Sequence, residues 1–105
     1  MRTVVERRRI LHAIDADAFG RLVSRLGAAR GYGAPYGVAL MLDGQADAWT
    51  EGNVSPWNIA PFVVLFEEAG ARFTDLNGER AWPCRSGLAA APELHRALLG
   101  VIRGL

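Results

Sequence analysis

The sequence predicts an α/β fold, a single compact domain in which a mixed sheet carries helices on both faces. Segments rich in β-branched or small apolar residues alternate with amphipathic segments, which is the pattern of a layered α/β domain. Half of the 105 residues are hydrophobic and 22% are charged, so we expect an ordered core. This length suffices for one domain and not for two, and we therefore expect residues 1–105 to form one domain.

The first elements alternate strand and helix. RRRILHAI (7–14) mixes β-branched and other apolar residues and is predicted to be a strand. A helix follows, with Asp15 or Asp17 as its cap and Gly27 as its end. ARGYGAPYG (29–37) is punctuated by glycines, which favours a short strand that runs into a turn.

Proline marks the start of each of the three later helices. Pro35 favours a helix over Tyr36–Leu42, and Asp43-Gly44 ends it before an extended segment, ADAWTEG (46–52). The clearest helix has Ser55 as N-cap, Pro56 at its first position and Gly70 as its stop, and Pro61 inside it should kink it. Two strands, a turn and a closing helix complete the pattern: ARFTD (71–75), Asn77-Gly78, GLAAA (87–91) and the amphipathic segment from Pro92.

Composition excludes several functional classes. Twelve basic and eleven acidic residues give a net charge of +1, which offers no electrostatic reason to bind nucleic acid or an anionic membrane. The single cysteine, Cys84, excludes a disulfide framework and a cysteine-built zinc site. No apolar run approaches the roughly 18 residues of a membrane span. The first ten residues lack the apolar core of a signal peptide, so we expect a cytoplasmic protein.

Four motifs in one order connect the chain to a known family. From about Gly27 to Leu99 the sequence resembles the C-terminal half of the inositol monophosphatase superfamily, and most closely its histidinol-phosphate phosphatase branch. The resemblance implies the fold of that family's C-terminal α/β lobe. The segments that carry it are RGYGAPYG (30–37), DGQADAWTEG (43–52), SPWNIAPFVVLFEEAGARFTDLNG (55–78) and LAAAPELHRALL (88–99).

The sequence departs from this family at the metal site. The resemblance implies magnesium-assisted hydrolysis of phosphate esters, in which a cage of carboxylates holds the ions. Most of those ligands come from G-E-E and D-P-x-D-G-T motifs in an N-terminal lobe, and neither motif occurs here. Asn58 stands where the family has an aspartate after the tryptophan, and Ala34 stands where an acidic residue is common. We therefore expect no metal, no other cofactor and no magnesium phosphatase activity from this chain alone.

Glu51 is the first candidate catalytic residue, because the resemblance implies a substrate-contacting glutamate at this spacing before Asn58. A carboxylate there can accept hydrogen bonds from substrate hydroxyls or an amine. The alternative is a glutamate that only caps or is solvated at the helix end. Trp57 and Asn58 are predicted to line the substrate pocket together with Tyr32 and Tyr36, unless Trp57 belongs to the core, as large aromatic side chains usually do.

The remaining candidates are His12 and Asp15, three residues apart at a predicted strand end, where ligand sites collect in α/β folds. A histidine beside a carboxylate can act as a general base near neutral pH, although most lone histidines are structural. For His95 we expect packing or exposure instead of catalysis, and Cys84 has no evident base partner.

Two functional hypotheses of different classes follow. In the first, the chain is a repurposed lobe that binds a small polar metabolite and performs metal-independent acid/base chemistry, such as isomerisation, elimination or cyclisation, in a biosynthetic pathway. In the second, it is a non-catalytic binding or regulatory module, or half of a magnesium phosphatase that a partner chain completes. Loss of an N-terminal lobe would expose apolar surface, so we expect a homodimer. Its interface would draw on Trp49, Trp57, Phe62 and Phe66, unless these residues form an ordinary core.

Overall fold

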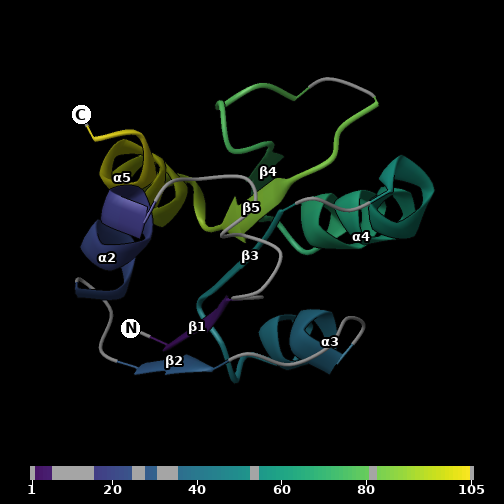
Figure 1. The fold of residues 1–105 in the computed structure, drawn as a ribbon. Helices are drawn as coiled ribbons and strands as arrows, with labels where there is room; N and C mark the ends of the chain where they lie inside the picture. The colour runs from purple at the N-terminus through teal and green to yellow at the C-terminus, as the bar shows by residue number, and fades with distance from the viewer. Residues whose placement is uncertain are drawn as a thin grey trace.

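The structure is a computed structural model that describes residues 2–5, 16–24, 28–30, 36–52, 55–80 and 83–104 (Figure 1). In these residues strands and helices alternate along most of the chain, as the sequence pattern predicts. The elements are β1 (Arg2–Val5), α2 (Ala16–Ser24), β2 (Ala28–Arg30), α3 (Tyr36–Leu42), β3 (Ala48–Glu51), α4 (Pro56–Glu68), β4 (Arg72–Thr74), β5 (Gly87–Ala90) and α5 (Pro92–Arg103).

The strands form one mixed sheet in the order β2-β1-β3-β5-β4. β1 runs parallel to both β2 and β3, whereas β5 runs antiparallel to β3 and to β4. The register between β3 and β5 pairs Trp49 with Ala89 and Glu51 with Gly87. The sheet is therefore mixed, which confirms the prediction from the sequence.

Helices cover both faces of the sheet. α2 and α5 lie together on one side, and α3 and α4 lie on the other (Figure 1). Because successive side chains of a strand point to opposite faces, Ala48 packs into the core under α2 and α5, while Trp49 packs into the core under α3 and α4. The helices close these two cores with Leu22, Leu98 and Ile102 on one face and Val38, Ile59 and Phe66 on the other.

Proline and glycine residues mark several of the helix boundaries. The predicted helix Tyr36–Leu42 is confirmed to the residue. Pro56 and Pro92 open α4 and α5, where the fixed backbone angle of proline suits the first turn. Gly70 follows α4 with φ +90°, a left-handed conformation that favours glycine. Pro61 lies within α4, and the kink that the sequence predicts there stays a prediction.

Three expectations require correction or lie beyond the description. β1 at Arg2–Val5 was not predicted, because four residues are too short for an alternating signal, and the predicted strand 7–14 lies outside the described residues. Trp57 is 71% exposed, so its assignment to the core is wrong. Trp49 of β3 and Phe66 of α4 are fully buried in the core between the sheet and the helices, so they cannot belong to the predicted dimer interface.

Candidate functional site

Glu51 ends β3 in the interior of the fold. Only 2% of this residue is exposed, and it lies opposite Gly87 in the β3–β5 register. The neighbouring Thr50 donates its hydroxyl proton to the Gly87 carbonyl over 3.0 Å. The interpretation of Glu51 as a solvated surface carboxylate is therefore wrong, because the side chain is held beneath the surface.

The backbone next to Glu51 is close-packed. A Cβ added at Gly87 would lie 2.6 Å from Cζ of Phe73 and 3.0 Å from Cδ1 of Ile59. Only glycine therefore lets β5 run beside Glu51 with the Phe73 ring in this position. Packing on the face of the sheet that α3 and α4 cover thus fixes the strand that pairs with Glu51.

The first turn of α4 presents two of the predicted site residues to solvent. Trp57 and Asn58 are both exposed, and they follow Glu51 by six and seven residues. Ser55 occupies the N-cap position without a side-chain hydrogen bond to the helix. The start of α4 carries the partial positive charge of a helix N-terminus, which favours anions in its vicinity. The chain can span at most about 3.5 Å per residue, so the six residues from Glu51 to Trp57 limit their separation to about 21 Å.

The other predicted site residues are not tested by the structure. His12, Asp15 and Tyr32 lie outside the described residues. Tyr36 begins α3, and its side chain is likewise outside the description. The structure places Glu51 at the end of β3 and Trp57 and Asn58 in the first turn of α4, and leaves the remaining residues as predictions.

A hollow lies between α4, β4 and the segment that leads to β5. Its volume is about 180 Å³, and none of Glu51, Trp57 and Asn58 lines it. The lining residues are Ala60, Val63, Val64, Glu67, Phe73, Glu79, Arg80 and Cys84.

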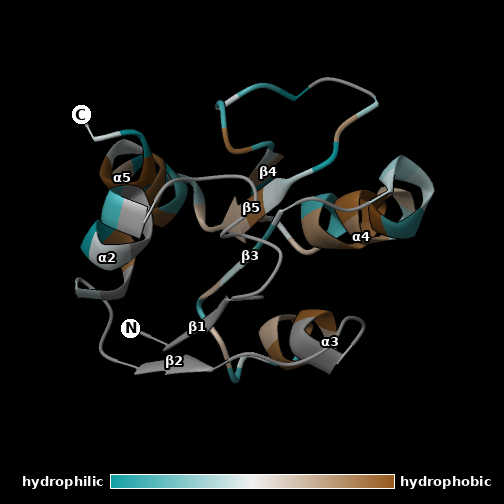
Figure 2. Cartoon of the chain, in the orientation of Figure 1, coloured by the Kyte–Doolittle hydropathy of each residue, from teal (hydrophilic) through white to brown (hydrophobic). Residues whose placement is uncertain are grey.

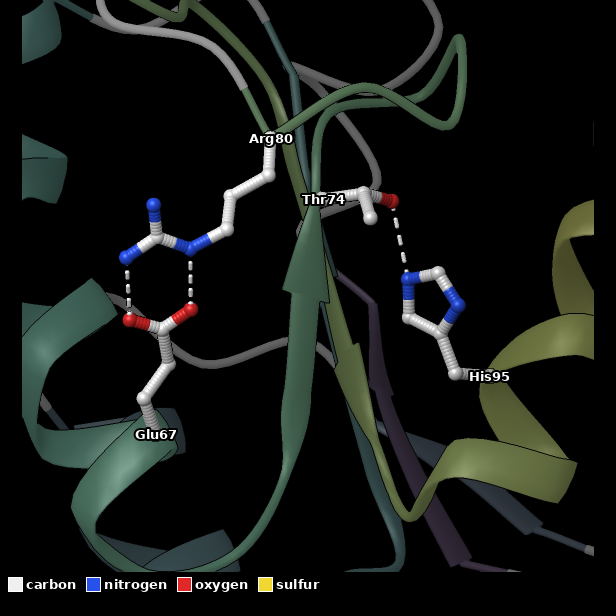
Figure 3. Close-up of polar contacts among 4 residues, drawn as sticks. All are labelled: Glu67, Thr74, Arg80 and His95. Carbon is white, nitrogen blue, oxygen red and sulfur yellow. Dashed lines mark hydrogen bonds and ion pairs between the residues drawn. The ribbon is translucent and has the colours of Figure 1, made fainter.

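An ion pair stands at the edge of this hollow (Figure 3). Arg80 donates from Nε to Oε2 of Glu67 over 2.5 Å and from Nη2 to Oε1 over 2.7 Å. This contact lowers the pKa of Glu67 and raises that of Arg80. The thiol of Cys84 is buried, and burial followed by the charge of Asp75 raises its pKa, so it is mainly protonated near neutral pH.

A buried polar pair that no sequence motif indicated lies on the opposite face of the sheet. His95 of α5 is fully buried, and its Nε2 lies 2.8 Å from Oγ1 of Thr74 (Figure 3). The two residues are 21 positions apart, so no local spacing could have joined them. Of the two alternatives expected for His95, packing and surface exposure, the structure shows packing.

The described residues offer no ready metal centre and no membrane span. Among them, no group of three or more histidine, cysteine, aspartate or glutamate side chains is arranged to hold a metal ion. In the same part of the chain, no helix has the length and apolar character to cross a bilayer.

Comparison with known proteins identifies the family. The model of the inositol monophosphatase family matches residues 3–104, and the chain therefore belongs to this family. The chain is 33% identical over 98 residues to inositol-1-monophosphatase of Bacillus subtilis, covering 90% of this chain and 36% of that protein. It is 35% identical over 88 residues to histidinol-phosphatase of Streptomyces coelicolor, covering 82% of this chain and 32% of that protein.

Solved structures agree on the fold. The extragenic suppressor protein SuhB of Bartonella henselae superposes with a TM-score of 0.80 at 18% identity, over 96% of this chain and 40% of that one. Inositol monophosphatase-II of Staphylococcus aureus also gives 0.80, at 21% identity, over 94% of this chain and 39% of that one. The chain thus spans about a third of the length of its curated relatives and has the fold of one lobe.

Proposed function

We propose that residues 1–105 form a single-domain lobe of the inositol monophosphatase family that binds a small polar metabolite at the β3–α4 junction. We further propose that its chemistry is metal-independent acid/base catalysis with Glu51 as the acid or base. The observation that carries the proposal is the burial of Glu51 at the end of β3, which is followed in sequence by a helix start whose Trp57 and Asn58 face solvent.

The junction offers complementary groups to such a ligand. A carboxylate accepts charge-assisted hydrogen bonds from hydroxyl or ammonium groups, and these bonds strengthen where water is excluded. The N-terminus of α4 supplies backbone donors and a partial positive charge for an anionic group. Trp57 adds an exposed apolar face against which a ring can pack. A ligand with hydroxyls or an amine at one end and a phosphate at the other satisfies all three.

The names of the relatives point to the same class of ligand. The Bacillus subtilis relative is named for inositol monophosphate, the phosphate ester of a cyclic polyol, and the Streptomyces coelicolor relative for histidinol phosphate, the ester of an amino alcohol. Both compounds join a phosphate to neighbouring hydroxyl or amine groups. We therefore propose a phosphate ester of a polyol or amino alcohol, or the corresponding free alcohol, as the ligand.

The donor set near the junction does not suit the magnesium chemistry that the family resemblance implies. Magnesium requires hard, anionic oxygen ligands in near-octahedral arrangement, usually carboxylates with retained water. Asn58 offers one neutral amide oxygen, and Glu51 is the one carboxylate among the described junction residues. The proposed acid/base chemistry therefore uses protein groups, and the further candidates beside Glu51 are His12, Asp15, Tyr32 and Tyr36.

The length comparison favours a second candidate function. Because the chain spans about a third of its relatives, it is also suited to be one lobe of a phosphatase whose other residues lie in a further stretch of polypeptide. A binding or regulatory lobe without catalysis belongs to the same class. In both of these candidates the 105-residue chain catalyses no reaction by itself, which distinguishes them from the first.

Isothermal titration tests the proposal. The purified chain is titrated with magnesium, inorganic phosphate, inositol 1-phosphate and histidinol phosphate, in parallel with the variants Glu51→Gln and Glu93→Gln. We expect a phosphate ester to bind without magnesium, to be lost in Glu51→Gln, and to be retained in Glu93→Gln, which changes an exposed carboxylate on α5.

The outcomes separate the candidates. Tight magnesium binding by the chain alone would overturn the metal-independent proposal. Failure of both esters and phosphate to bind would overturn the ligand site and favour the lobe that needs further polypeptide. Thermal unfolding of each variant establishes that a lost heat signal reflects the removed carboxylate instead of a lost fold.

A further inference from the structure

One face of α4 forms the apolar wall of the hollow between α4, β4 and the segment that leads to β5. Ala60, Val63, Val64 and Glu67 all line the hollow, and their spacing of three or four residues places them on a single face of the helix. Figure 2 shows the middle turns of α4 as hydrophobic. The wall is therefore apolar along most of its length and becomes charged at Glu67.

The interior of the hollow is uncharged and suits one small ring or branched alkyl group. Phe73 of β4 and Cys84 contribute an aromatic ring and a thiol to the lining. Burial raises the pKa of the Cys84 thiol, which therefore adds no charge near neutral pH. The volume is about 180 Å³, and an apolar cavity of about 150 Å³ in another protein accepts benzene.

A guanidinium group stands at the edge of the hollow with part of its binding capacity free of Glu67. Arg80 pairs with Glu67 through Nε and Nη2, which engages two of the five N–H donors of the guanidinium group. The third nitrogen, Nη1, points away from Glu67 (Figure 3). This side of Arg80 suits a second carboxylate, because the planar guanidinium group can bind two carboxylates along different edges.

A second carboxylate of the protein, that of Glu79, lines the hollow next to Arg80. A turn fixes the backbone here: Asp75 N donates to the Glu79 carbonyl over 2.8 Å, and Glu79 N donates to Oδ1 of Asp75 over 2.9 Å. The charged lining residues Glu67, Arg80 and Glu79 thus carry two negative charges and one positive charge. An apolar lining with a few placed polar groups is typical of small-molecule sites.

We propose that this hollow binds an apolar α-amino acid of about the size of leucine or phenylalanine. The amino acid side chain fills the hollow, its α-carboxylate binds Nη1 of Arg80, and its α-ammonium group binds the carboxylate of Glu79. A simple amine would meet the charge of Arg80 without compensation, and a simple carboxylate would meet those of Glu67 and Glu79. A zwitterion complements both signs. The inference is independent of the proposed metabolite site, because none of Glu51, Trp57 and Asn58 lines the hollow.

Three ligands with the same aromatic ring test the charge recognition. The purified chain is titrated by calorimetry with L-phenylalanine, with 2-phenylethylamine, which lacks the carboxylate, and with 3-phenylpropionate, which lacks the ammonium group. We expect phenylalanine to bind with a Kd of about 0.1–1 mM and each analogue to bind at least about threefold more weakly. Absence of phenylalanine binding would overturn the site, and an analogue that binds as tightly would overturn the zwitterion assignment.

Filling the hollow tests its location. Ala60→Leu adds apolar volume to the wall, so we expect phenylalanine to bind at least about tenfold more weakly. Ala97→Leu is the matched control, because Ala97 is exposed on α5, outside the hollow, and its binding should be unchanged. Unchanged binding by a folded Ala60→Leu variant, verified by circular dichroism, would overturn the location.

Two charge variants test the roles at the rim. Arg80→Gln should weaken phenylalanine binding about threefold to tenfold without weakening 2-phenylethylamine binding, and Glu79→Gln should weaken the binding of both. Arg96→Gln and Glu93→Gln on α5 control for the change in net charge. Equal effects of Arg80→Gln on the two ligands would overturn the assignment of the α-carboxylate to Arg80.

Alkylation of Cys84 provides a readout in the unaltered protein. The thiol lines the hollow, so phenylalanine at ten times its Kd should slow modification by iodoacetamide several-fold, up to about tenfold, as occupancy rises. 2-Phenylethylamine at the same concentration should protect less. An unchanged alkylation rate under conditions where calorimetry shows saturation would place the amino acid elsewhere and overturn the inference.

Discussion

The imidazole Nε2 of His95 lies 2.8 Å from the hydroxyl oxygen of Thr74, in a site where both residues are buried. The Thr74 hydroxyl also lies 2.8 Å from the Asp75 carbonyl, to which it donates. The imidazole therefore donates to Thr74 from Nε2, which assigns the proton of the neutral ring to that nitrogen. Among the described residues Nδ1 makes no hydrogen bond, and the interaction of the ring with the Leu88 backbone offsets only part of the lowering of its pKa.

Acidification should destabilise the protein through His95. Burial, followed by the charge of Arg72, lowers the pKa of His95 below its ordinary value of 6.5. Below pH 6.5 the unfolded chain therefore binds a proton that the folded chain resists, and the free energy of unfolding falls as pH drops toward the folded pKa. The slope from one group is at most about 1.4 kcal/mol per pH unit.

Urea unfolding at pH 7.5, 6.5 and 5.5 measures this slope. His95→Gln cannot titrate at this position, so its unfolding free energy should vary less over the same range, while His12 is present in both proteins. Equal pH dependence in the two proteins would show that His95 is not the group responsible.

Loss of the Thr74 hydroxyl should lower the free energy of unfolding, because it breaks the buried hydrogen bond between Thr74 and His95. Thr74→Val keeps the shape of the side chain but leaves Nε2 of His95 buried without its partner, and we expect a loss of about 1–3 kcal/mol in stability. The double variant Thr74→Val/His95→Leu removes both polar partners, so it should cost less than the two single changes added together. Strict additivity in chemical unfolding would argue against a coupled pair.

Gly87→Ala should destabilise the strand that lies beside Glu51. The new methyl group would meet the Phe73 ring at 2.6 Å, and overpacking of this kind costs about 1–3 kcal/mol. Gly100→Ala is the matched control, because no atom lies within 4 Å of its added methyl group inside α5. There alanine should stabilise the helix by about 0.5–1 kcal/mol. Similar unfolding midpoints for the two variants would contradict the packing around Gly87.

The sequence predicted the fold best where backbone chemistry is local. Pro56 and Pro92 open helices because their fixed φ suits a first turn, and Gly70 ends one because glycine tolerates positive φ. β1 was not predicted because it is a strand only through its pairing with β2 and β3, which are distant in sequence. Local rules carry no information about such partners.

The candidate site was predictable only in part, for the same reason. Resemblance to a family indicated Glu51, but its burial results from the packing of β5 and α4 around the end of β3. The alternative that Trp57 belongs to the core rested on the general tendency of tryptophan to be buried, and it is wrong because exposure depends on what covers the first turn of α4. The pairing of Thr74 with His95 required the tertiary structure, since it joins β4 to α5 across the sheet.

Cys84 should react slowly with alkylating reagents in the folded protein. Burial, followed by the charge of Asp75, raises the pKa of its thiol, so less thiolate is present at pH 8 than in the unfolded chain. Asp75→Asn should accelerate native alkylation, because the amide oxygen can still accept the hydrogen bonds that Asn77 N and Glu79 N donate, while the charge is removed. Iodoacetamide modification followed by mass spectrometry measures both rates. A native rate equal to that in concentrated urea, or no change in Asp75→Asn with the fold intact, would contradict this account of the thiol.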